Sequence, residues 1–198
     1  MAYRVRLAAA PDAEAICRIY NQGIEDRVAT LEMELRTPDE RRQWLAGRTP
    51  RHPVIVAELA EVIVAGTVRP ALTEGGLRQA RSGSASADNP SSSIGPVGWA
   101  SLNVFNAREA YRFVADISVY VERGWRGRGV GRVLLEKLTE LGRAHGFHKL
   151  VLSAFPGNAG GMALYTKSGF RTVGVYHEQG QLNGKWVDTI VMEKLLSA

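Results

Sequence analysis

The sequence predicts an α/β protein in which helices flank a mixed β-sheet. Short apolar or alternating segments recur along the whole chain, and amphipathic helical patterns separate several of them. The last two strand-like segments are joined by a turn containing Asn183-Gly184, which is a strong hairpin signal. We therefore expect the order strand, two helices, three or four strands, helix, strand, helix, strand, strand.

Length and composition are typical of a single globular domain that spans residues 1–198. Of the 198 residues, 45% are hydrophobic and 23% are charged. The net charge of +5 suits an anionic ligand, but the arginines are spread along the chain, so we expect no nucleic-acid surface. No secretory or transmembrane-length apolar run is visible, so we expect no membrane partner.

The few cysteines and histidines give no sign of a metal site. Cys17 is the only cysteine, so the sequence allows no internal disulfide and no cysteine cluster, which fits a reducing cytoplasm. The histidines show no metal-ligand spacing; they are His52, His145, His148 and His177. We expect a cytoplasmic protein without a metal.

The first half of the chain predicts two strands with two helices between them. Residues 3–7 alternate as a strand does, and Pro11 suits the first turn of the following helix. A capping box at 37–40, with proline at the first helical position, predicts a second helix that ends near Gly47. Residues 54–58 then read as a buried strand.

Residues 70–96 have a different character from the rest of the chain. They are rich in glycine and serine, have few large apolar residues and show no periodicity. We interpret them as a flexible insertion in a hairpin. The alternative is a linker between two domains, but the first half of the chain is too short and too poor in apolar residues to form its own core.

The second half contains the motif on which the functional hypothesis depends. An apolar strand at 116–121 leads into a loop with glycines at 127, 129 and 131, and the loop opens an amphipathic helix. Glycines let a ligand approach the backbone closely, and the first N–H groups of a helix favour negative charge. With three arginines around it, this loop predicts a pyrophosphate site, the alternative being a glycine-rich turn on a basic surface. Further strands are expected at 97–102 and 150–154 and a short helix at 158–168.

The pattern Arg126-x-x-Gly129-x-Gly131 after Val119-Tyr120-Val121 resembles the acetyl-CoA loop of the GNAT superfamily of N-acyltransferases. Further segments resemble its phosphinothricin, arsinothricin and methionine sulfoximine N-acetyltransferases. These segments include 98–102, Arg108-x-Ala110-Tyr111 and Lys185-Trp186-x-Asp188, and together the matches cover nearly the whole chain outside the insertion. The resemblance implies the GNAT fold, with a mixed, mostly antiparallel sheet.

The resemblance also implies a role for particular residues. Acetyl-CoA, the co-substrate, would be bound by Val119, Tyr120, Val121, Arg126, Gly127, Arg128, Gly129, Val130, Gly131, Arg132 and Asn158. Asp116 stands where the family has its catalytic base, usually a glutamate, and would act directly or through a water. Tyr165 would protonate the departing thiolate. The alternatives are a strand-end carboxylate paired with an arginine and an aromatic core residue.

The same resemblance implies an acceptor and a quaternary structure. The acceptor would be the α-amine of a small amino-acid analogue, consistent with a detoxification or resistance role. Its contacts would come from Arg108, Tyr111, Asn21, Lys185 and Trp186. Arginine suits an acidic group through its bidentate fork, although Arg108 could equally be an exposed loop residue. The resemblance places Lys185 and Trp186 on a hairpin that crosses into the partner of a homodimer, and otherwise they are ordinary strand residues.

Two other functions stay open from the sequence. One is a CoA-dependent enzyme that acetylates protein or peptide amines, against which the Arg-x-Ala-Tyr element argues. The other is a non-catalytic basic module for polyanions, which predicts clustered lysines and arginines with interleaved aromatics. Lysine is scarce here, and the arginines are spread along the chain apart from the group at the glycine loop, so the enzyme is favoured.

Overall fold

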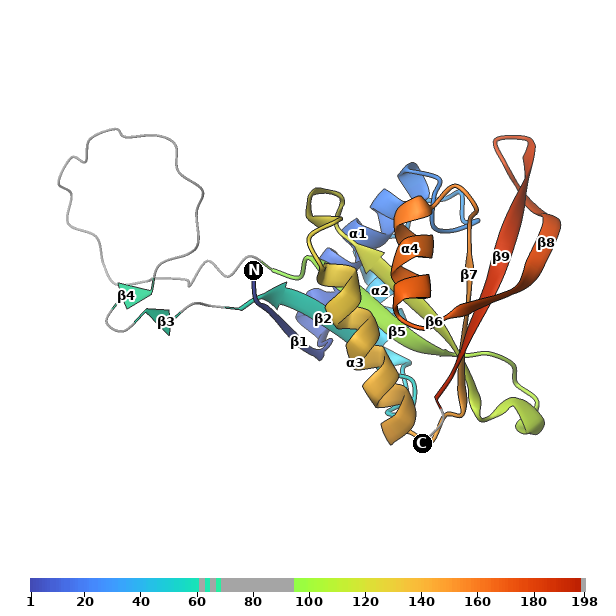
Figure 1. The fold of residues 1–198 in the computed structure, drawn as a ribbon. Coiled ribbons are helices and arrows are strands. Elements are labelled where there is room, and N and C mark those ends of the chain that lie inside the picture. The colour runs from blue at the N-terminus through green and yellow to red at the C-terminus, as the bar shows by residue number, and fades with distance from the viewer. Residues whose placement is uncertain (61–62, 65–66, 69–94, 197–198) are drawn as a thin grey trace.

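A computed structural model describes residues 1–60, 63–64, 67–68 and 95–196. Seven strands form one sheet with the order β1-β2-β5-β6-β7-β9-β8 (Figure 1). They are β1 (Tyr3–Leu7), β2 (Val54–Leu59), β5 (Gly98–Val104), β6 (Val114–Val121), β7 (Lys149–Ala154), β8 (Arg171–Leu182) and β9 (Lys185–Leu195). Two short strands, β3 (Ile63–Val64) and β4 (Thr67–Val68), pair with each other. Of the expected insertion at 70–96, all but residues 95 and 96 lie outside the described residues.

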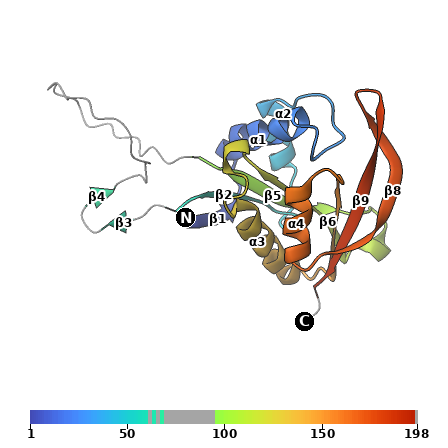
Figure 2. The same cartoon turned by 45° about the horizontal axis from the view of Figure 1, so that its top comes forward.

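The sheet is mixed and mostly antiparallel, as predicted. Strands β6 and β7 are parallel, whereas the other neighbours in the seven-stranded sheet are antiparallel. Helices α1 (Ala13–Glu25) and α2 (Pro38–Ala46) cover one face, and α3 (Val130–Ala144) and α4 (Ala159–Lys167) cover the other (Figures 1 and 2). Single 3-10 turns η1 (Ala10–Asp12), η2 (Glu109–Tyr111) and η3 (Arg123–Trp125) join these elements.

Strand β6 presents different residues to the two faces, because side chains alternate along a strand. Ala115 and Ile117 are buried in the core that includes α3. Tyr120 instead packs against the core that includes α1. Asp116 and Ser118, four and two positions before Tyr120, therefore share the face that α1 and α2 cover, and this face holds the polar residues of the site.

The pairing between β6 and β7 stops early. The register runs through Val114↔Lys149, Ala115↔Leu150 and Asp116↔Val151. Residues 117–121 of β6 continue to pair with β5, but the described strands give them no partner on the β7 side. The two strands thus diverge beyond Asp116, and the N–H and C=O groups of β6 along the fork are available to a ligand.

The C-terminal hairpin confirms the turn signal in the sequence. Asn183 and Gly184 have φ values of +52° and +75°, as a two-residue type I′ turn requires. Strand β8 continues to Leu182 through an irregularity between Tyr176 and Gly180. Among the helices that the structure describes, none has both the length and the apolar character needed to cross a membrane.

Helix α2 begins with the capping box that the sequence predicts. The Glu40 N–H donates to Thr37 Oγ1 at 3.2 Å, and the Thr37 N–H donates to Glu40 Oε2 at 2.6 Å. Pro38 follows at the first helical position. The cap fixes where the helix starts, and hence which of its side chains face the sheet.

Replacing Thr37 with alanine should lower the free energy of unfolding by about 1 kcal/mol, because one backbone N–H of the first turn loses its acceptor. Urea denaturation measures this loss, and Thr37→Ser, which keeps the hydroxyl, should remain within a few tenths of a kcal/mol of wild type. Equal stability of the alanine and serine variants would contradict a role for the cap.

Candidate active site

The glycine loop ahead of α3 exposes several backbone amides. Gly127 and Gly129 have φ values of +74° and +88°, in the left-handed region that favours glycine. Val133 N–H donates to Gly129 O at 3.3 Å. The amides of the first turn that precede Val133 have no intrahelical acceptor. The loop therefore presents donors at the positive end of a helix, where an anionic ligand is favoured.

The arginines of the loop differ in what they contact. Arg126 pairs with Asp26 at the end of α1 at 2.6 Å and donates from Nε to Val121 O at 3.3 Å. Arg132 pairs with Glu136 at 3.3 Å on the exposed side of α3. The Arg128 guanidinium lies 5.3 Å from the centre of the Trp125 ring. Arg126 thus ties the loop to α1, while Arg132 stays at the surface.

A cavity of about 470 Å³, here called the donor cavity, lies beside this loop. Nine of the eleven residues predicted to bind acetyl-CoA line it: Val119, Tyr120, Val121, Arg126, Gly127, Gly129, Gly131, Arg132 and Asn158. The other two, Arg128 and Val130, do not, and Val130 is buried in the core. Helix α1 contributes Ile19 and Gly23, which the sequence did not single out.

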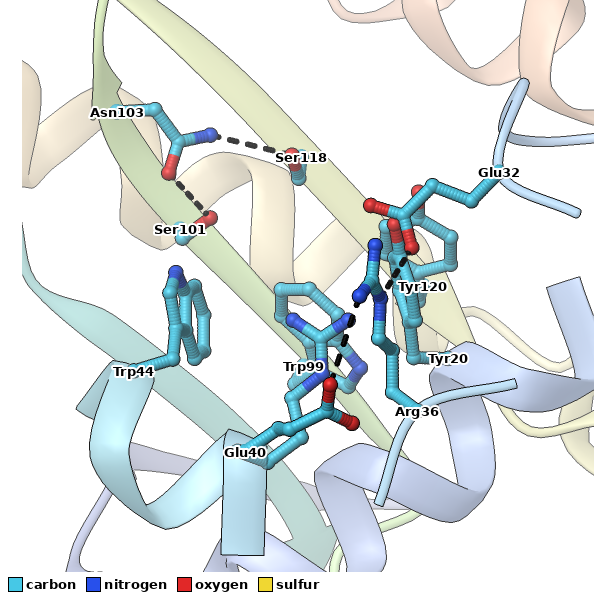
Figure 3. A pocket seen from close by; sticks show the side chains of 11 residues that line it. Tyr20, Glu32, Arg36, Glu40, Trp44, Trp99, Ser101, Asn103, Ser118 and Tyr120 are labelled. Atoms are coloured by element: carbon cyan, nitrogen blue, oxygen red, sulfur yellow. Dashed lines mark hydrogen bonds and ion pairs between the residues drawn. The ribbon is translucent and has the colours of Figure 1, made fainter. Parts of the chain in front are cut away.

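Asp116 lies at the fork between β6 and β7. Asn103 Nδ2 donates to Asp116 Oδ2 at 3.4 Å and to Ser118 Oγ at 3.1 Å. Ser101 Oγ donates to Asn103 Oδ1 at 3.0 Å (Figure 3). Burial raises the pKa of Asp116 to about 6, although the hydrogen bond from Asn103 opposes the shift. The carboxyl group is therefore mostly ionised at neutral pH and still basic enough to accept a proton.

Tyr165, on α4, lines the donor cavity. Burial, together with the charge of Asp116, raises its pKa to about 12. Its ring packs edge-on against Phe170 at a centroid distance of 6.0 Å. The phenol therefore carries its proton at neutral pH and can donate it within the cavity.

A second cavity, of about 410 Å³, lies between the sheet and the segment that joins α1 to α2, and is here called the acceptor cavity (Figure 3). Its walls combine aromatic rings with polar side chains. They are formed by Tyr20, Glu32, Arg36, Glu40, Arg41, Trp44, Trp99, Ser101, Asn103, Ser118 and Tyr120. Tyr120 lines both cavities, so its ring separates them, and Asn103 connects the acceptor cavity to Asp116.

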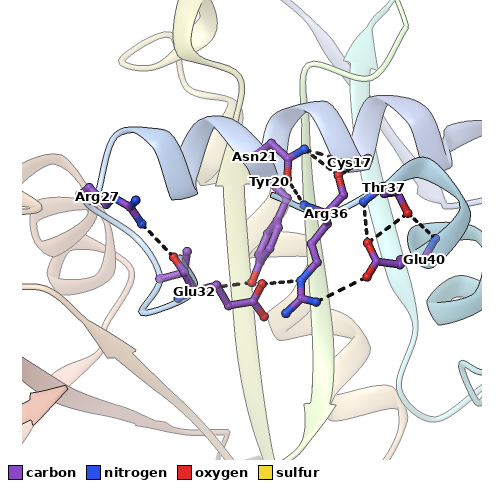
Figure 4. A network of polar contacts seen from close by, with 9 residues as sticks. Cys17, Tyr20, Asn21, Arg27, Glu32, Arg36, Thr37 and Glu40 are labelled. Atoms are coloured by element: carbon purple, nitrogen blue, oxygen red, sulfur yellow. Dashed lines mark hydrogen bonds and ion pairs between the residues drawn. The ribbon is translucent and has the colours of Figure 1, made fainter. Parts of the chain in front are cut away.

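A polar network holds the segment between α1 and α2 over this cavity (Figure 4). Asn21 accepts from Arg36 N–H at 2.9 Å and donates to Arg36 O at 2.8 Å. The Arg36 side chain then pairs with Glu32 at 2.7 Å and with Glu40 at 3.6 Å. Burial opposes the ionisation of Glu32, but the hydrogen bonds from Arg36 and Tyr20 outweigh it and hold the Glu32 pKa below its ordinary value. Asn21, predicted to bind substrate, lines neither cavity but fixes the backbone of a residue that does.

The remaining residues predicted to bind substrate also lie away from both cavities. Arg108 precedes η2, and Tyr111, in η2, is 38% exposed and packs against Phe105. Because this turn lies between Arg108 and β6, the chain does not run directly from Arg108 to Asp116. Lys185 and Trp186 begin β9 at the exposed tip of the hairpin. Their proposed roles stay predictions.

Sequence reasoning missed most of the acceptor cavity, because four separate segments of the chain contribute to it. One signal was present in α2. Arg41, Trp44 and Leu45 have the spacing that places them on one helix face, and a charged residue beside two apolar ones is unusual on a face that meets a core.

The chain is similar in sequence and in fold to known acetyltransferases. Residues 78–170 match the family described as "Acetyltransferase (GNAT) family". The L-methionine sulfoximine/L-methionine sulfone acetyltransferase of Pseudomonas aeruginosa is 28% identical over 194 residues, which cover 98% of this chain and 94% of that protein.

Two solved structures extend the likeness to the whole fold. The ribosomal-protein-alanine N-acetyltransferase from Brucella melitensis is 30% identical, with a TM-score of 0.75, over 97% of this chain and 99% of that one. The phosphinothricin acetyltransferase from Sinorhizobium meliloti, in complex with AcCoA, is 25% identical, with a TM-score of 0.76, over 98% of this chain and 89% of that one.

Replacing Gly131 with valine should weaken acetyl-CoA binding at least tenfold, which corresponds to about 1.4 kcal/mol. A Cβ atom there would lie 2.8 Å from Leu164 Cδ2, so the added side chain fills part of the donor cavity. Leu164 meets it with the end of a flexible side chain, so the fold should persist. Calorimetric titration with acetyl-CoA, together with a melting curve, measures both effects.

Gly124→Val provides the matched control, because nothing lies within 4 Å of the position that its Cβ would take, and Gly124 does not line the donor cavity. This variant should bind acetyl-CoA like wild type. Unchanged affinity in Gly131→Val would mean that acetyl-CoA does not occupy the donor cavity.

Proposed function

Since the chain belongs to the GNAT acetyltransferase family, in the group of phosphinothricin and methionine sulfoximine acetyltransferases, we propose that it transfers acetyl from acetyl-CoA to the α-amine of a small amino-acid analogue. One observation carries the proposal. The donor and acceptor cavities meet at Tyr120, and a carboxyl group with a raised pKa lies on the same strand.

Acetyl-CoA is assigned to the donor cavity. Its pyrophosphate suits the amides and the positive helix end at the glycine loop, together with Arg126 and Arg132. Its amide-containing arm suits the edge of β6 beyond Asp116, where the backbone N–H and C=O groups that face away from β5 have no partner among the described strands. A ligand bound in this way would lead its thioester along β6 towards Asp116.

Asp116 is assigned as the base, and the transfer is direct. An ammonium group cannot attack a thioester, so the acceptor must first lose a proton, which the Asp116 carboxylate accepts. The amine nitrogen then bonds to the acetyl carbon, the bond from that carbon to sulfur breaks, and the nitrogen loses its second proton, which restores the proton that Tyr165 gives up. Tyr165 gives its proton to the departing sulfur, and no covalent acyl-enzyme is formed.

The amino-acid acceptor is assigned to the acceptor cavity. Its aromatic walls suit the methylene groups of a side chain, while Ser101, Asn103 and Ser118 lead to the base. The alternative acceptor is a protein amine, which the likeness to a ribosomal-protein-alanine N-acetyltransferase favours.

A thiol-release assay on a panel of acceptors tests the proposal. We expect turnover of phosphinothricin, methionine sulfoximine or methionine sulfone, and at least tenfold lower kcat/KM on a peptide that begins with alanine, because a cavity of about 410 Å³ encloses a single side chain. Spermidine serves as an amine without a carboxylate. A preference for the peptide or for spermidine would exclude an amino-acid acceptor.

The pH profile tests Asp116. Because its folded-state pKa is about 6, kcat/KM should fall below pH 6 as the base becomes protonated. Asp116→Asn should lower kcat by about 100-fold or more and remove this acidic limb. Steady-state rates between pH 5 and about 8.5 measure both, and an unchanged limb in the variant would assign the base elsewhere.

The pH dependence of the free energy of unfolding tests the Asp116 pKa independently of activity. The folded pKa of about 6 lies above the ordinary value of 3.8, so the native state binds this proton more tightly. The resulting stabilisation is complete below about pH 4 and is lost as the pH rises through about 6. Asp116→Asn should therefore gain on wild type by up to about 3 kcal/mol at neutral pH and by much less at pH 4.

A further inference from the structure

The acceptor cavity contains a buried arginine that forms no ion pair with the described residues. Arg41, on α2, is only 9% exposed, and its guanidinium lies 3.9 Å above the centre of the Tyr20 ring. Its Nε has no hydrogen-bond partner, and no ion pair among the described residues includes it. A buried charge without a partner is costly, so this arginine is well suited to meet an anion that arrives with a ligand.

A second unsatisfied donor lines the same cavity. Trp99, on β5, is 2% exposed, and its Nε1 is the other buried side-chain nitrogen that lacks a partner in the described part of the chain. Its ring stacks on Tyr120 at 4.8 Å and lies 6.0 Å from Tyr20, the ring that Arg41 covers. Arg41 and Trp99 thus gather two N–H donors around Tyr20, and both lack an acceptor.

The acidic residues of the cavity form no ion pair with Arg41, although its charge helps to hold the Glu32 pKa below its ordinary value. Glu32 and Glu40 both pair with Arg36, and Glu40 also caps α2. Asp116, the remaining carboxyl group near the cavity, is bound to Asn103. The Arg41 guanidinium and the Trp99 indole N–H are thus two donors without acceptors, and an anionic group on the ligand would satisfy both.

The strand register separates these donors from the base. Trp99 is paired with Tyr120, and Asn103 is paired with Asp116. The two pairs are four residues apart, which is roughly 13 Å along the strands. An amine at Asp116 therefore leaves its own α-carboxylate far from Arg41, while a group at the end of the acceptor's side chain points towards it.

We propose that Arg41 and the Trp99 indole N–H bind the acidic side-chain group, a carboxylate or phosphinate, of a glutamate-like acceptor whose α-amine faces Asp116. This inference rests on the proposed function and narrows it to acceptors with a distal negative charge. The rings of Tyr20, Trp44 and Tyr120 would surround the methylene groups between the two ends.

A matched pair of acceptors tests the charge alone. Phosphinothricin and methionine sulfone have the same skeleton, but the first ends in a methylphosphinate anion and the second in a neutral methylsulfone. Arg41→Gln should lower kcat/KM for phosphinothricin by about ten- to a hundredfold, mainly through KM, because a charge-assisted hydrogen bond is lost. For methionine sulfone the loss should stay within about threefold, and Arg41→Lys should lie between wild type and Arg41→Gln with phosphinothricin.

Two further variants separate binding from folding. Trp99→Phe keeps an aromatic ring but removes the N–H, and it should weaken phosphinothricin more than methionine sulfone. Arg42→Gln is the matched control, because Arg42 is the next residue of α2 but is exposed and paired with Asp39 and Glu14. It should behave like wild type with both acceptors. Melting curves and calorimetric titration with acetyl-CoA verify that every variant is folded and binds the donor.

The outcomes distinguish this assignment from the proposed function. Equal losses on the two acceptors in Arg41→Gln would overturn it, since Arg41 would then bind the α-carboxylate or support the fold. A charge-selective loss in Arg108→Ala, but not in Arg41→Gln, would assign the distal group to Arg108. If wild type acetylates peptides but no amino acid, the proposed function itself fails, and this assignment fails with it.

Discussion

Strands β6 and β7 share hydrogen bonds only from Val114 to Asp116, and the geometry of the site depends on where that pairing ends. Below this point the two strands are part of one continuous sheet. Above it, β6 keeps β5 on one side, while no described strand pairs with its other edge, beside which the donor cavity lies. The fork therefore supplies both a carboxyl group with a raised pKa and a backbone edge that can bind an extended ligand.

Burial at this fork acts on two neighbouring groups with opposite consequences for proton transfer. It raises the pKa of Asp116 to about 6 and that of Tyr165 to about 12. At neutral pH the first group is therefore mostly deprotonated and the second is protonated. The same desolvation thus gives one residue the properties of a base and the other those of an acid, and the Asp116 charge further stabilises the neutral phenol.

The part of the donor cavity around the glycine loop could be predicted from the sequence because one contiguous segment, 119–132, forms it. A strand, a glycine loop and a helix follow one another, and local backbone preferences determine their geometry. The acceptor cavity could not be predicted in this way, since α1, the segment before α2, α2 itself, β5 and β6 contribute only one to three residues each. Arg108 illustrates the limit: the resemblance implies that it contacts the acceptor, but it is exposed before η2 and lines neither cavity.

Burying Arg41 without an ion-pair partner lowers the stability of the fold, and the binding of an anionic ligand group accounts for an arginine at this position. Much of the water around Arg41 is already displaced in the free protein, by Tyr20 and Trp44. An incoming anion therefore meets a poorly solvated cation, and their attraction is stronger than it would be at the surface. A neutral side chain of the same shape leaves the charge unpaired. The cavity thus discriminates between acceptors by charge more sharply than by size. Arg41 is already desolvated before any ligand binds, and a neutral acceptor does not offset that cost.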